Sequence, residues 1–138
     1  MHHIYENSVG FARLQKGGPA PYPDGTIFAD DVRDVSLADG SYSQGSRKAI
    51  PVMLKDSKKY ASTGGWGFQA WAGGDPTKPL VTDAVKSCFT CHTPQKANDY
   101  VFSTYLHYRQ RSQSSACTHA SARASSRPAA PFDAAAFS

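Results

Sequence analysis

The distribution of hydrophobic and polar residues along the chain predicts three β-strands. The first covers Thr26 to Val35, ends in the turn Ala38-Asp39-Gly40 and continues after Tyr42. In the second, Arg47 to Leu54, both alternating sets of side chains are largely apolar, so we expect both faces to be covered. Pro51 lies inside this stretch and indicates a sheet edge or a bulge, because proline has no backbone N–H to donate. The third strand, Trp66 to Trp71, follows a pair of glycines and carries aromatic side chains on both faces.

Helical patterns lie on either side of these strands. Apolar residues at helical spacing predict a short amphipathic helix within residues 3–16, and the glycine- and proline-rich stretch 17–25 ends it. Residues 55–60 predict a capped helical turn, with Asp56 or Ser57 as the cap and with its lysines on a solvated face.

The pattern changes towards the C-terminus. Residues 97–108 still hold several large apolar side chains and predict a helix or an extended segment that closes the core. From Arg111 onward the periodicity disappears, and of these 28 residues nine are Ala and seven are Ser. Such a segment cannot bury enough apolar surface to offset its ordering entropy. We therefore predict one folded domain over residues 1–110 and a disordered tail over residues 111–138.

Composition and charge narrow the classes of function. A chain of 138 residues with 40% hydrophobic residues has the length of one domain with one modest core. The formal net charge of +4 comes from basic residues that are scattered and not interleaved with aromatic ones, so no nucleic-acid partner is expected. No apolar run is long enough to span a membrane. The chain also begins without the basic and apolar layout of a signal peptide.

The stretch Cys88-Phe89-Thr90-Cys91-His92 carries the strongest chemical motif of the chain. Two thiols three positions apart can face the same way on one helical turn, and the adjoining imidazole can reach over the plane that they define. A haem attached through two thioether bonds requires this arrangement: Cys88 and Cys91 bind the vinyl carbons, and His92 binds the iron. The motif therefore predicts one covalent haem c per chain, with His92 as the metal ligand.

Two other interpretations of the motif remain open. A redox pair of the CxxC type would need the motif to open a helix after a buried strand, whereas the amphipathic stretch 81–87 precedes it here. A zinc-stabilised domain without haem would need four ligands, and the candidate additional ones are His107, Cys117 and His119. Cys117 and His119 lie in the segment predicted to be disordered. Three cysteines are an odd number, which argues against a disulfide framework.

Beyond the motif, the chain resembles the cytochrome P-460 family, which includes the cytochromes c′-beta, over roughly residues 3–108. The strands before the motif argue against the four-helix cytochromes c′, and no methionine follows His92 as in the small helical cytochromes c. The matching stretches are Tyr22-Pro23-Asp24-Gly25-Thr26, Val52-Met53-Leu54-Lys55-Asp56-Ser57-Lys58-Lys59-Tyr60, Gly64-Gly65-Trp66-Gly67-Phe68 and Cys88-Phe89-Thr90-Cys91-His92-Thr93-Pro94-Gln95-Lys96-Ala97-Asn98-Asp99-Tyr100-Val101-Phe102-Ser103.

The resemblance implies an α+β fold. We expect a mostly antiparallel β-sheet with short peripheral helices and with the c-type haem motif near the C-terminal end of the domain. The resemblance also implies one haem c, often a homodimer, and a haem domain over residues 1–110 whose front part is missing. Because haem is attached to thiols outside the bacterial cytoplasm, we expect a periplasmic protein whose export signal has been lost from the start of the sequence.

Functions divide within the family that the chain resembles. The hydroxylamine-oxidising members carry a lysine cross-linked to the haem on the strand after the proline–aspartate–glycine turn, and the matching place here is near Asp30. No lysine occurs from Thr26 to Ser46. The resemblance therefore favours a redox or nitric-oxide-binding cytochrome with a five-coordinate, His-ligated iron, whose partner is a small diatomic ligand or a redox protein. A haem oxidoreductase that acts on hydroxylamine or nitric oxide is the alternative.

Several other residues are candidates for the haem pocket. Asp30 or Asp31 is a candidate haem-edge carboxylate, with an exposed strand position as the competing interpretation. Met53 would be a sixth iron ligand if the protein is an electron carrier, although a strand methionine more often belongs to the core. His107 is a weaker candidate for that role because it lies in a polar, aromatic run. The candidate pocket walls, each of which suits the sheet core equally well, are Phe28, Trp66, Phe68 and Trp71.

Overall fold

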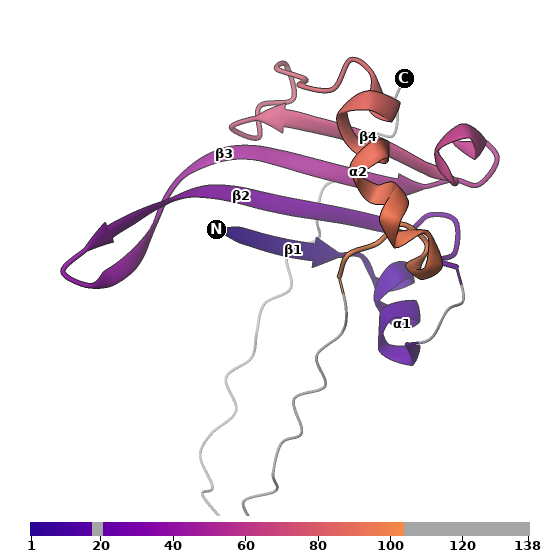
Figure 1. Ribbon diagram of the computed structural model, residues 1–138, viewed down its shortest axis with the longest axis horizontal. Helices are drawn as coiled ribbons and strands as arrows, with labels where there is room; N and C mark the ends of the chain where they lie inside the picture. The colour runs from indigo at the N-terminus through magenta and orange to yellow at the C-terminus, as the bar shows by residue number, and fades with distance from the viewer. Residues whose placement is uncertain (18–20, 104–138) are drawn as a thin grey trace, which may run out of the picture. The chain divides into compact units, whose positions relative to one another are not determined.

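The computed structural model describes residues 1–17 and 21–103, which contain one antiparallel sheet. Its four strands lie in the order β1-β2-β3-β4, so each strand pairs with its neighbour in the sequence (Figure 1). The described part of the chain is therefore mostly β-sheet with short helices, as the resemblance implied. The strands are β1 (His2–Glu6), β2 (Ile27–Ala38), β3 (Ser41–Lys55) and β4 (Trp66–Ala72).

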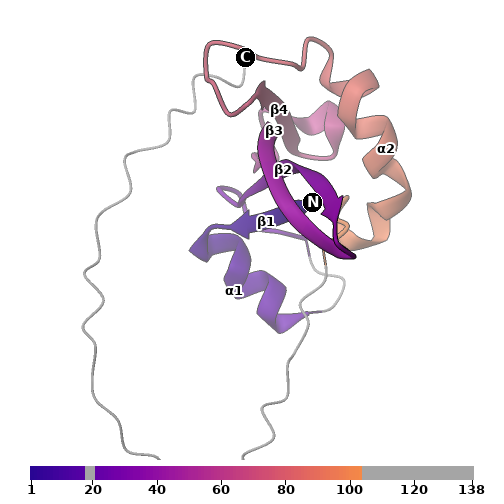
Figure 2. The same ribbon diagram turned by 90° about the vertical axis from the view of Figure 1, so that its left-hand side faces the viewer.

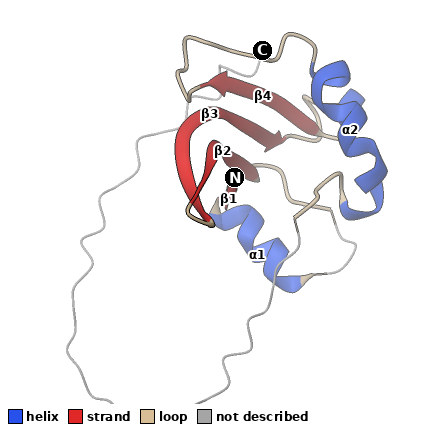
Figure 3. Cartoon of the chain, turned by 60° about the vertical axis from the view of Figure 1, so that its left-hand side comes forward, coloured by secondary structure: helices blue, strands red, loops and turns tan. Residues whose placement is uncertain are grey.

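The strands β2 and β3 form a long hairpin. β2 extends further than the sequence pattern predicted, and β3 joins the stretch expected after Tyr42 to the strand expected over Arg47 to Leu54. The two-residue turn Asp39-Gly40 joins them with φ angles of 52° and 73°. Positive φ at both positions is the type I′ geometry, whose twist suits a hairpin. Among the described residues, β1 pairs with β2 as far as Val32 and β4 pairs with β3 from Ala49. Beyond these points the two hairpin strands pair with each other and curve away from the sheet (Figure 3).

The predicted helix within residues 3–16 is wrong in its first part. His2–Glu6 forms strand β1 along the edge of β2, and helix α1 (Ser8–Lys16) begins only afterwards. Asn7 separates the two elements: its Oδ1 caps the helix by accepting from the N–H of Gly10, at 3.2 Å, and its Nδ2 donates to the carbonyl of Gly25. The edge of β2 offers backbone partners to the first residues, and this pairing outweighs their helical spacing.

Two further predictions concern β3. The edge or bulge predicted at Pro51 is wrong, because β3 lies between β2 and β4 and its register with both strands does not shift at Pro51. In the following turn, Oδ1 of Asp56 accepts from the backbone N–H groups of Lys58 and Lys59, which confirms Asp56 as the cap. Lys58 and Lys59 are exposed as predicted, but Lys55 is only 5% exposed. Lys55 is the last residue of β3, and it pairs with an acidic side chain from the far end of the domain.

A helical segment, residues 85–98, lies over one face of the sheet (Figure 2). It begins as the π-helical turn η2 (Val85–Phe89), continues as α2 (Thr90–His92) and ends as the 3₁₀ turn η3 (Thr93–Asn98). Of the segment 97–108, for which a helix or an extended segment was predicted, residues 99–103 are irregular and residues 104–108 lie outside the described part. The predicted disordered tail, residues 111–138, also lies outside it.

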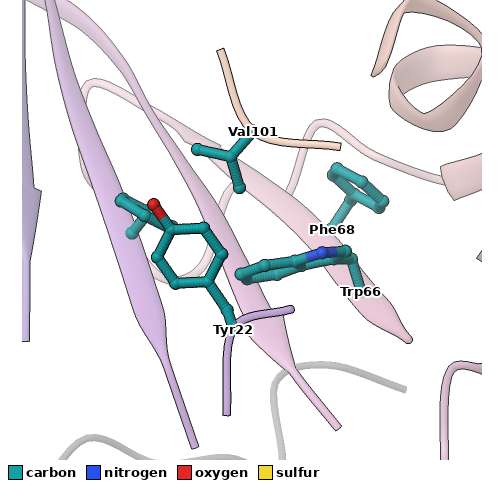
Figure 4. Packing of buried hydrophobic residues seen from close by; sticks show 5 residues of the cluster. Tyr22, Trp66, Phe68 and Val101 are labelled. Carbon is teal, nitrogen blue, oxygen red and sulfur yellow. The ribbon is translucent and has the colours of Figure 1, made fainter. Parts of the chain in front are cut away.

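The hydrophobic core lies between the sheet and the helical segment. Aromatic rings dominate it: the ring centroids of Tyr22 and Phe28 are 5.3 Å apart, and those of Tyr22 and Trp66 are 5.8 Å apart (Figure 4). Helix α1 contributes Leu14 to the same cluster, and the helical segment contributes Phe89. Burial of this apolar surface packs both helical elements against the aromatic cluster. The fully packed members of the cluster are Tyr22, Phe28, Trp66, Phe68 and Val101.

Candidate functional site

A cavity of about 540 Å³ lies between the sheet and the helical segment. Its volume falls within the range that small-molecule and cofactor pockets occupy, roughly 300–1,000 Å³. The two cysteines and the histidine of the CxxCH motif all line it. The residues that line it from the sheet are mostly apolar: Ile4, Phe28, Ala29, Asp30, Pro51, Val52, Met53, Phe68, Gln69 and Ala70.

Strand register explains the sheet wall of the cavity. Phe28 of β2 lies opposite Met53 of β3, which in turn lies opposite Phe68 of β4. Side chains directly opposite each other project from the same face of a sheet, so these three form a continuous apolar row. Alternation along each strand then places Asp30 and Ala70 on this face two positions further on.

The helical wall carries the chemistry of the motif. Cys88 and Cys91 are free thiols; Cys88 is half-buried and Cys91 is exposed. Burial raises the pKa of the Cys88 thiol, and the neighbouring Cys91 adds to this effect. Cys88 lies in the π-helical turn η2, whereas Cys91 and His92 lie in α2. Such single π-helical turns occur frequently at functional sites.

The imidazole of His92 is held in one tautomer. Its Nδ1 lies 2.7 Å from the backbone carbonyl oxygen of Tyr100. A carbonyl oxygen only accepts hydrogen bonds, so Nδ1 carries the proton and Nε2 keeps its lone pair. The rings of Phe68 and Phe102 flank the imidazole, each with its centroid 5.1 Å away. The hydrogen bond at Nδ1 thus leaves Nε2 available to a metal, which is the arrangement that metal-bound histidines usually show.

These residues fit a covalently attached haem. Two free thiols and an imidazole with a free Nε2 line a single cavity of suitable volume with a mostly apolar sheet wall. Cys88 and Cys91 would hold the group, and His92 would bind its iron. The sequence prediction grouped these three residues together, and the structure places all three at the same cavity.

The structure separates the two aspartates that the sequence could not distinguish. Asp30 lines the cavity; its Oδ2 lies 2.6 Å from Nδ1 of His2, and its Oδ1 is buried without a hydrogen-bond partner among the described residues. Asp31 projects from the opposite face, where it accepts from Arg33 at 2.8 Å and from Arg47 at 2.7 Å and 3.0 Å. The hydrogen bonds from Arg47 and Arg33 hold the pKa of Asp31 well below its usual range.

Only some of the other candidate pocket residues line the cavity. Phe28, Phe68 and Met53 line the cavity. Trp66 is fully buried in the core and is not among the residues of the described part that line the cavity. Trp71 projects from the opposite face of β4, because it is an odd number of positions away from Phe68. His107 lies outside the described residues.

Glu6 is a polar residue near the cavity that the sequence analysis did not identify. Both of its carboxylate oxygens are buried and have no hydrogen-bond partner among the described residues. It lines a second cavity of about 420 Å³, which shares Ile4, Phe28 and Ser103 with the first. Burial raises the pKa of Glu6 to about 7, although Arg13 partly opposes this effect.

The contacts of Lys55 and Asp99 were also missed. Lys55 Nζ lies 2.8 Å from Oδ1 of Asp99, and the two side chains are only 6% and 12% exposed. One signal for this pair was present in the sequence: alternation along β3 places Lys55 on the same face as Met53 and therefore toward the core. Its partner, 44 positions further along the chain, carried no such signal.

Residues 1–17 and 21–103 contain neither a membrane-spanning helix nor a cluster of metal-ligating side chains. No helix in this part is long and apolar enough to cross a membrane. No group of three or more His, Cys, Asp or Glu side chains in it could hold a metal ion. The additional ligands that a zinc site would need, His107, Cys117 and His119, lie outside the described residues, so that alternative stays a prediction.

Comparison with protein families gives one result. The family model described as Cytochrome P460 matches residues 1–103, which is most of the chain and includes the entire CxxCH motif. No curated protein matches the chain.

Proposed function

We propose, from the premise that this chain belongs to the cytochrome P460 family, that it is a mono-haem c-type cytochrome. Membership of the family makes the protein a haem-binding cytochrome. In our proposal, Cys88 and Cys91 hold one haem covalently and His92 binds its iron. The iron is five-coordinate and serves in redox transfer or in the binding of nitric oxide.

One observation carries this proposal. The two thiols and the imidazole line the same cavity, and the hydrogen bond from Nδ1 of His92 to Tyr100 leaves Nε2 free for iron. A CxxC redox pair would not need this orientation of the histidine. A haem bound here would supply an iron that exchanges one electron or binds a small molecule. His92 would orient that iron, and the sheet wall would exclude water from it.

The apolar sheet wall supports a neutral diatomic ligand. Phe28, Met53 and Phe68 form a row across the cavity. A polar or charged ligand buried against this row without a hydrogen-bond partner would lose about 1–3 kcal/mol. Nitric oxide avoids this cost because it is neutral and weakly polar. Met53 is the one methionine that lines the cavity, and its thioether would be the sixth ligand of an electron carrier.

A hydroxylamine-oxidising enzyme is the second candidate, and Asp30 is the observation that favours it. A carboxylate at the cavity wall, with one buried oxygen that has no partner in the described part of the chain, could accept a hydrogen bond from an N–H or O–H group of a substrate. The absence of lysine from Thr26 to Ser46 argues against this enzyme, because the cross-link of the hydroxylamine-oxidising members requires one. We therefore retain it as the alternative.

The proposed cellular location and partners of the protein follow from the same proposal. Because haem is joined to thiols outside the bacterial cytoplasm, we place the protein in the periplasm. A small diatomic ligand or a redox protein would be its partner, and a second copy of the chain would form a homodimer with it.

Covalent retention of haem tests the proposal. The full chain is exported with a haem-attachment system, and haem is then extracted with acid and acetone. We expect the wild type and Cys117→Ala to retain one haem per chain, whereas Cys88→Ala with Cys91→Ala retains none. Haem that stays on the double variant would contradict the attachment. Zinc in place of iron in the purified wild type would support the zinc-stabilised alternative.

Two further measurements separate the candidate functions. The masses of the haem-bearing peptides after digestion should show one peptide, which contains Cys88 and Cys91. A second peptide joined to the haem, from any position before Cys88, would support the hydroxylamine-oxidising enzyme instead. Titration of the ferrous protein with nitric oxide should change its spectrum; a low-spin spectrum that does not respond would indicate Met53 or His107 on the iron.

A further inference from the structure

Two consecutive residues next to the haem motif have an unusual backbone. Asp99 and Tyr100 have φ angles of 50° and 65°, in the left-handed region that residues with a Cβ rarely adopt. The strain coincides with a contact that matters for the site, because Tyr100 supplies the carbonyl oxygen that accepts from Nδ1 of His92. Left-handed residues persist where the surrounding structure holds them, and they concentrate at functional sites.

The groups that hold this turn converge on Asp99. Its two carboxylate oxygens lie 2.8 Å and 2.9 Å from Nζ of Lys55, and Oδ2 also accepts from the N–H of Tyr22 at 2.8 Å. Its backbone carbonyl accepts from the indole N–H of Trp66, also at 2.8 Å. Asp99 is therefore held by residues of strand β3, of strand β4 and of the segment before β2. Figure 4 shows two of these residues, Tyr22 and Trp66, beside Val101, which lies two positions beyond Asp99.

Lys55 is itself fully engaged. Its Nζ donates to the carbonyl of Gly64 at 3.1 Å and lies 4.9 Å from the centre of the Trp66 ring. A buried lysine with a carboxylate, a carbonyl and an aromatic face around it has little freedom to move. Such buried pairs often contribute little net stability compared with apolar residues, so their presence calls for another reason.

We propose that the Lys55–Asp99 pair positions the iron ligand. It holds the left-handed turn that directs the Tyr100 carbonyl onto Nδ1 of His92. This inference rests on the proposed function, in which His92 binds haem iron. Neither Lys55 nor Asp99 lines the cavity in the described part, so both are positioning residues that act through Tyr100.

The chemical consequence concerns the basicity of His92. A hydrogen bond that Nδ1–H donates to a carbonyl increases the electron density on Nε2 and fixes the plane of the ring. A more basic ligand favours the ferric state and lowers the reduction potential. If the turn relaxed, the Tyr100 carbonyl would move away from Nδ1, His92 would be a weaker ligand for haem iron, and the reduction potential would rise.

The test uses the full chain with its haem attached and removes both charges together. Lys55→Met with Asp99→Asn leaves no unpaired buried charge, and asparagine tolerates the left-handed backbone better than other residues with a Cβ. Asp75→Asn is the matched control, because Asp75 forms an ion pair with Lys78 at 3.1 Å on the exposed surface. Trp66→Phe is a second test variant. It removes the indole N–H that donates to the Asp99 carbonyl and leaves a smaller aromatic ring in the core beside Lys55.

Three quantities are measured: covalent haem per chain, the ferrous iron–histidine stretching band in the resonance Raman spectrum, and the midpoint potential. We expect the double variant to keep its haem, to shift the band to lower frequency and to raise the potential. Trp66→Phe should shift both quantities in the same directions by a smaller amount, and Asp75→Asn should shift neither.

Two results would overturn the inference in distinguishable ways. An unchanged band and potential in a haem-loaded double variant would mean that the pair holds the fold without positioning His92. If the double variant does not fold, unchanged values in Trp66→Phe would show that the turn at Asp99, through which the pair is proposed to act, does not position His92. A wild type without covalent haem would instead overturn the proposed function, and the inference with it.

Discussion

The buried carboxyl of Glu6 predicts that the stability of this protein falls as the pH rises towards neutrality. Burial raises the pKa of Glu6 from its ordinary 4.5 to about 7, and its two oxygens have no hydrogen-bond partner among the described residues. Between these two pH values the folded state binds more protons than the unfolded state. The free energy of unfolding therefore decreases with pH across this window, and the contribution of Glu6 is lost as the pH passes about 7.

The magnitude follows from the span of pKa values. At about 1.4 kcal/mol for each pH unit, the upper limit is about 3 kcal/mol. Because Glu6 as a residue is only partly buried, solvent screening reduces this effect, and we expect about 1–2 kcal/mol. Glu6→Gln removes the titrating proton but keeps the shape of the side chain. The variant should therefore match the wild type near pH 4.5 and exceed its stability by about 1–2 kcal/mol at pH 8.

Urea unfolding followed by far-UV circular dichroism, at several pH values from 4.5 to 8, measures this difference. Asp39→Asn is the control, because Asp39 is an exposed carboxylate in the hairpin turn. The difference between wild type and control should not change over the same range. A difference between wild type and Glu6→Gln that is independent of pH, or that favours the wild type as the pH rises, would refute the reasoning.

Two further predictions use matched pairs of variants and thermal or urea unfolding. Gly64→Ala should destabilise the fold by more than Gly73→Ala, although both glycines have φ near 65°, at 67° and 62°. A Cβ on Gly64 would lie 2.2 Å from the Tyr100 ring, whereas a Cβ on Gly73 would have no described atom within 4 Å. We expect about 1–2 kcal/mol for Gly73→Ala and at least about 2 kcal/mol more for Gly64→Ala, and equal losses would show that the Tyr100 ring does not pack there. Phe68→Ala should cost about 3–5 kcal/mol and Phe102→Ala less than about 1 kcal/mol, because both rings lie 5.1 Å from His92 but they are 7% and 56% exposed. Similar losses from the two would contradict the assignment of Phe68 to the core.

Much of the sheet could be predicted from local pattern. The strand Trp66–Trp71, with Trp66 and Phe68 on one face and Trp71 on the other, agrees with β4 (Trp66–Ala72). The strand predicted over Thr26–Val35 lies largely within β2. The first strand was missed because its residues gain their hydrogen bonds from the edge of β2, and helical spacing carries no information about a partner more than twenty positions away. The same limit explains Lys55, whose partner is distant in the sequence.

The sequence by itself determined the chemistry of the protein: two thiols and an imidazole within five residues, and an alternation that sends neighbouring strand residues to opposite faces. Only the tertiary structure decided which face meets the motif. Asp30 and Asp31 are equivalent in local pattern, yet one lines the cavity and the other pairs with Arg33 and Arg47. Alternation along a strand predicts that neighbouring side chains such as Asp30 and Asp31 lie on opposite faces of the sheet. It does not predict which face the helical segment covers, and only that face lines the cavity. The hydrogen bond of His92 to the Tyr100 carbonyl, eight positions along the chain, likewise depends on groups that only folding brings together.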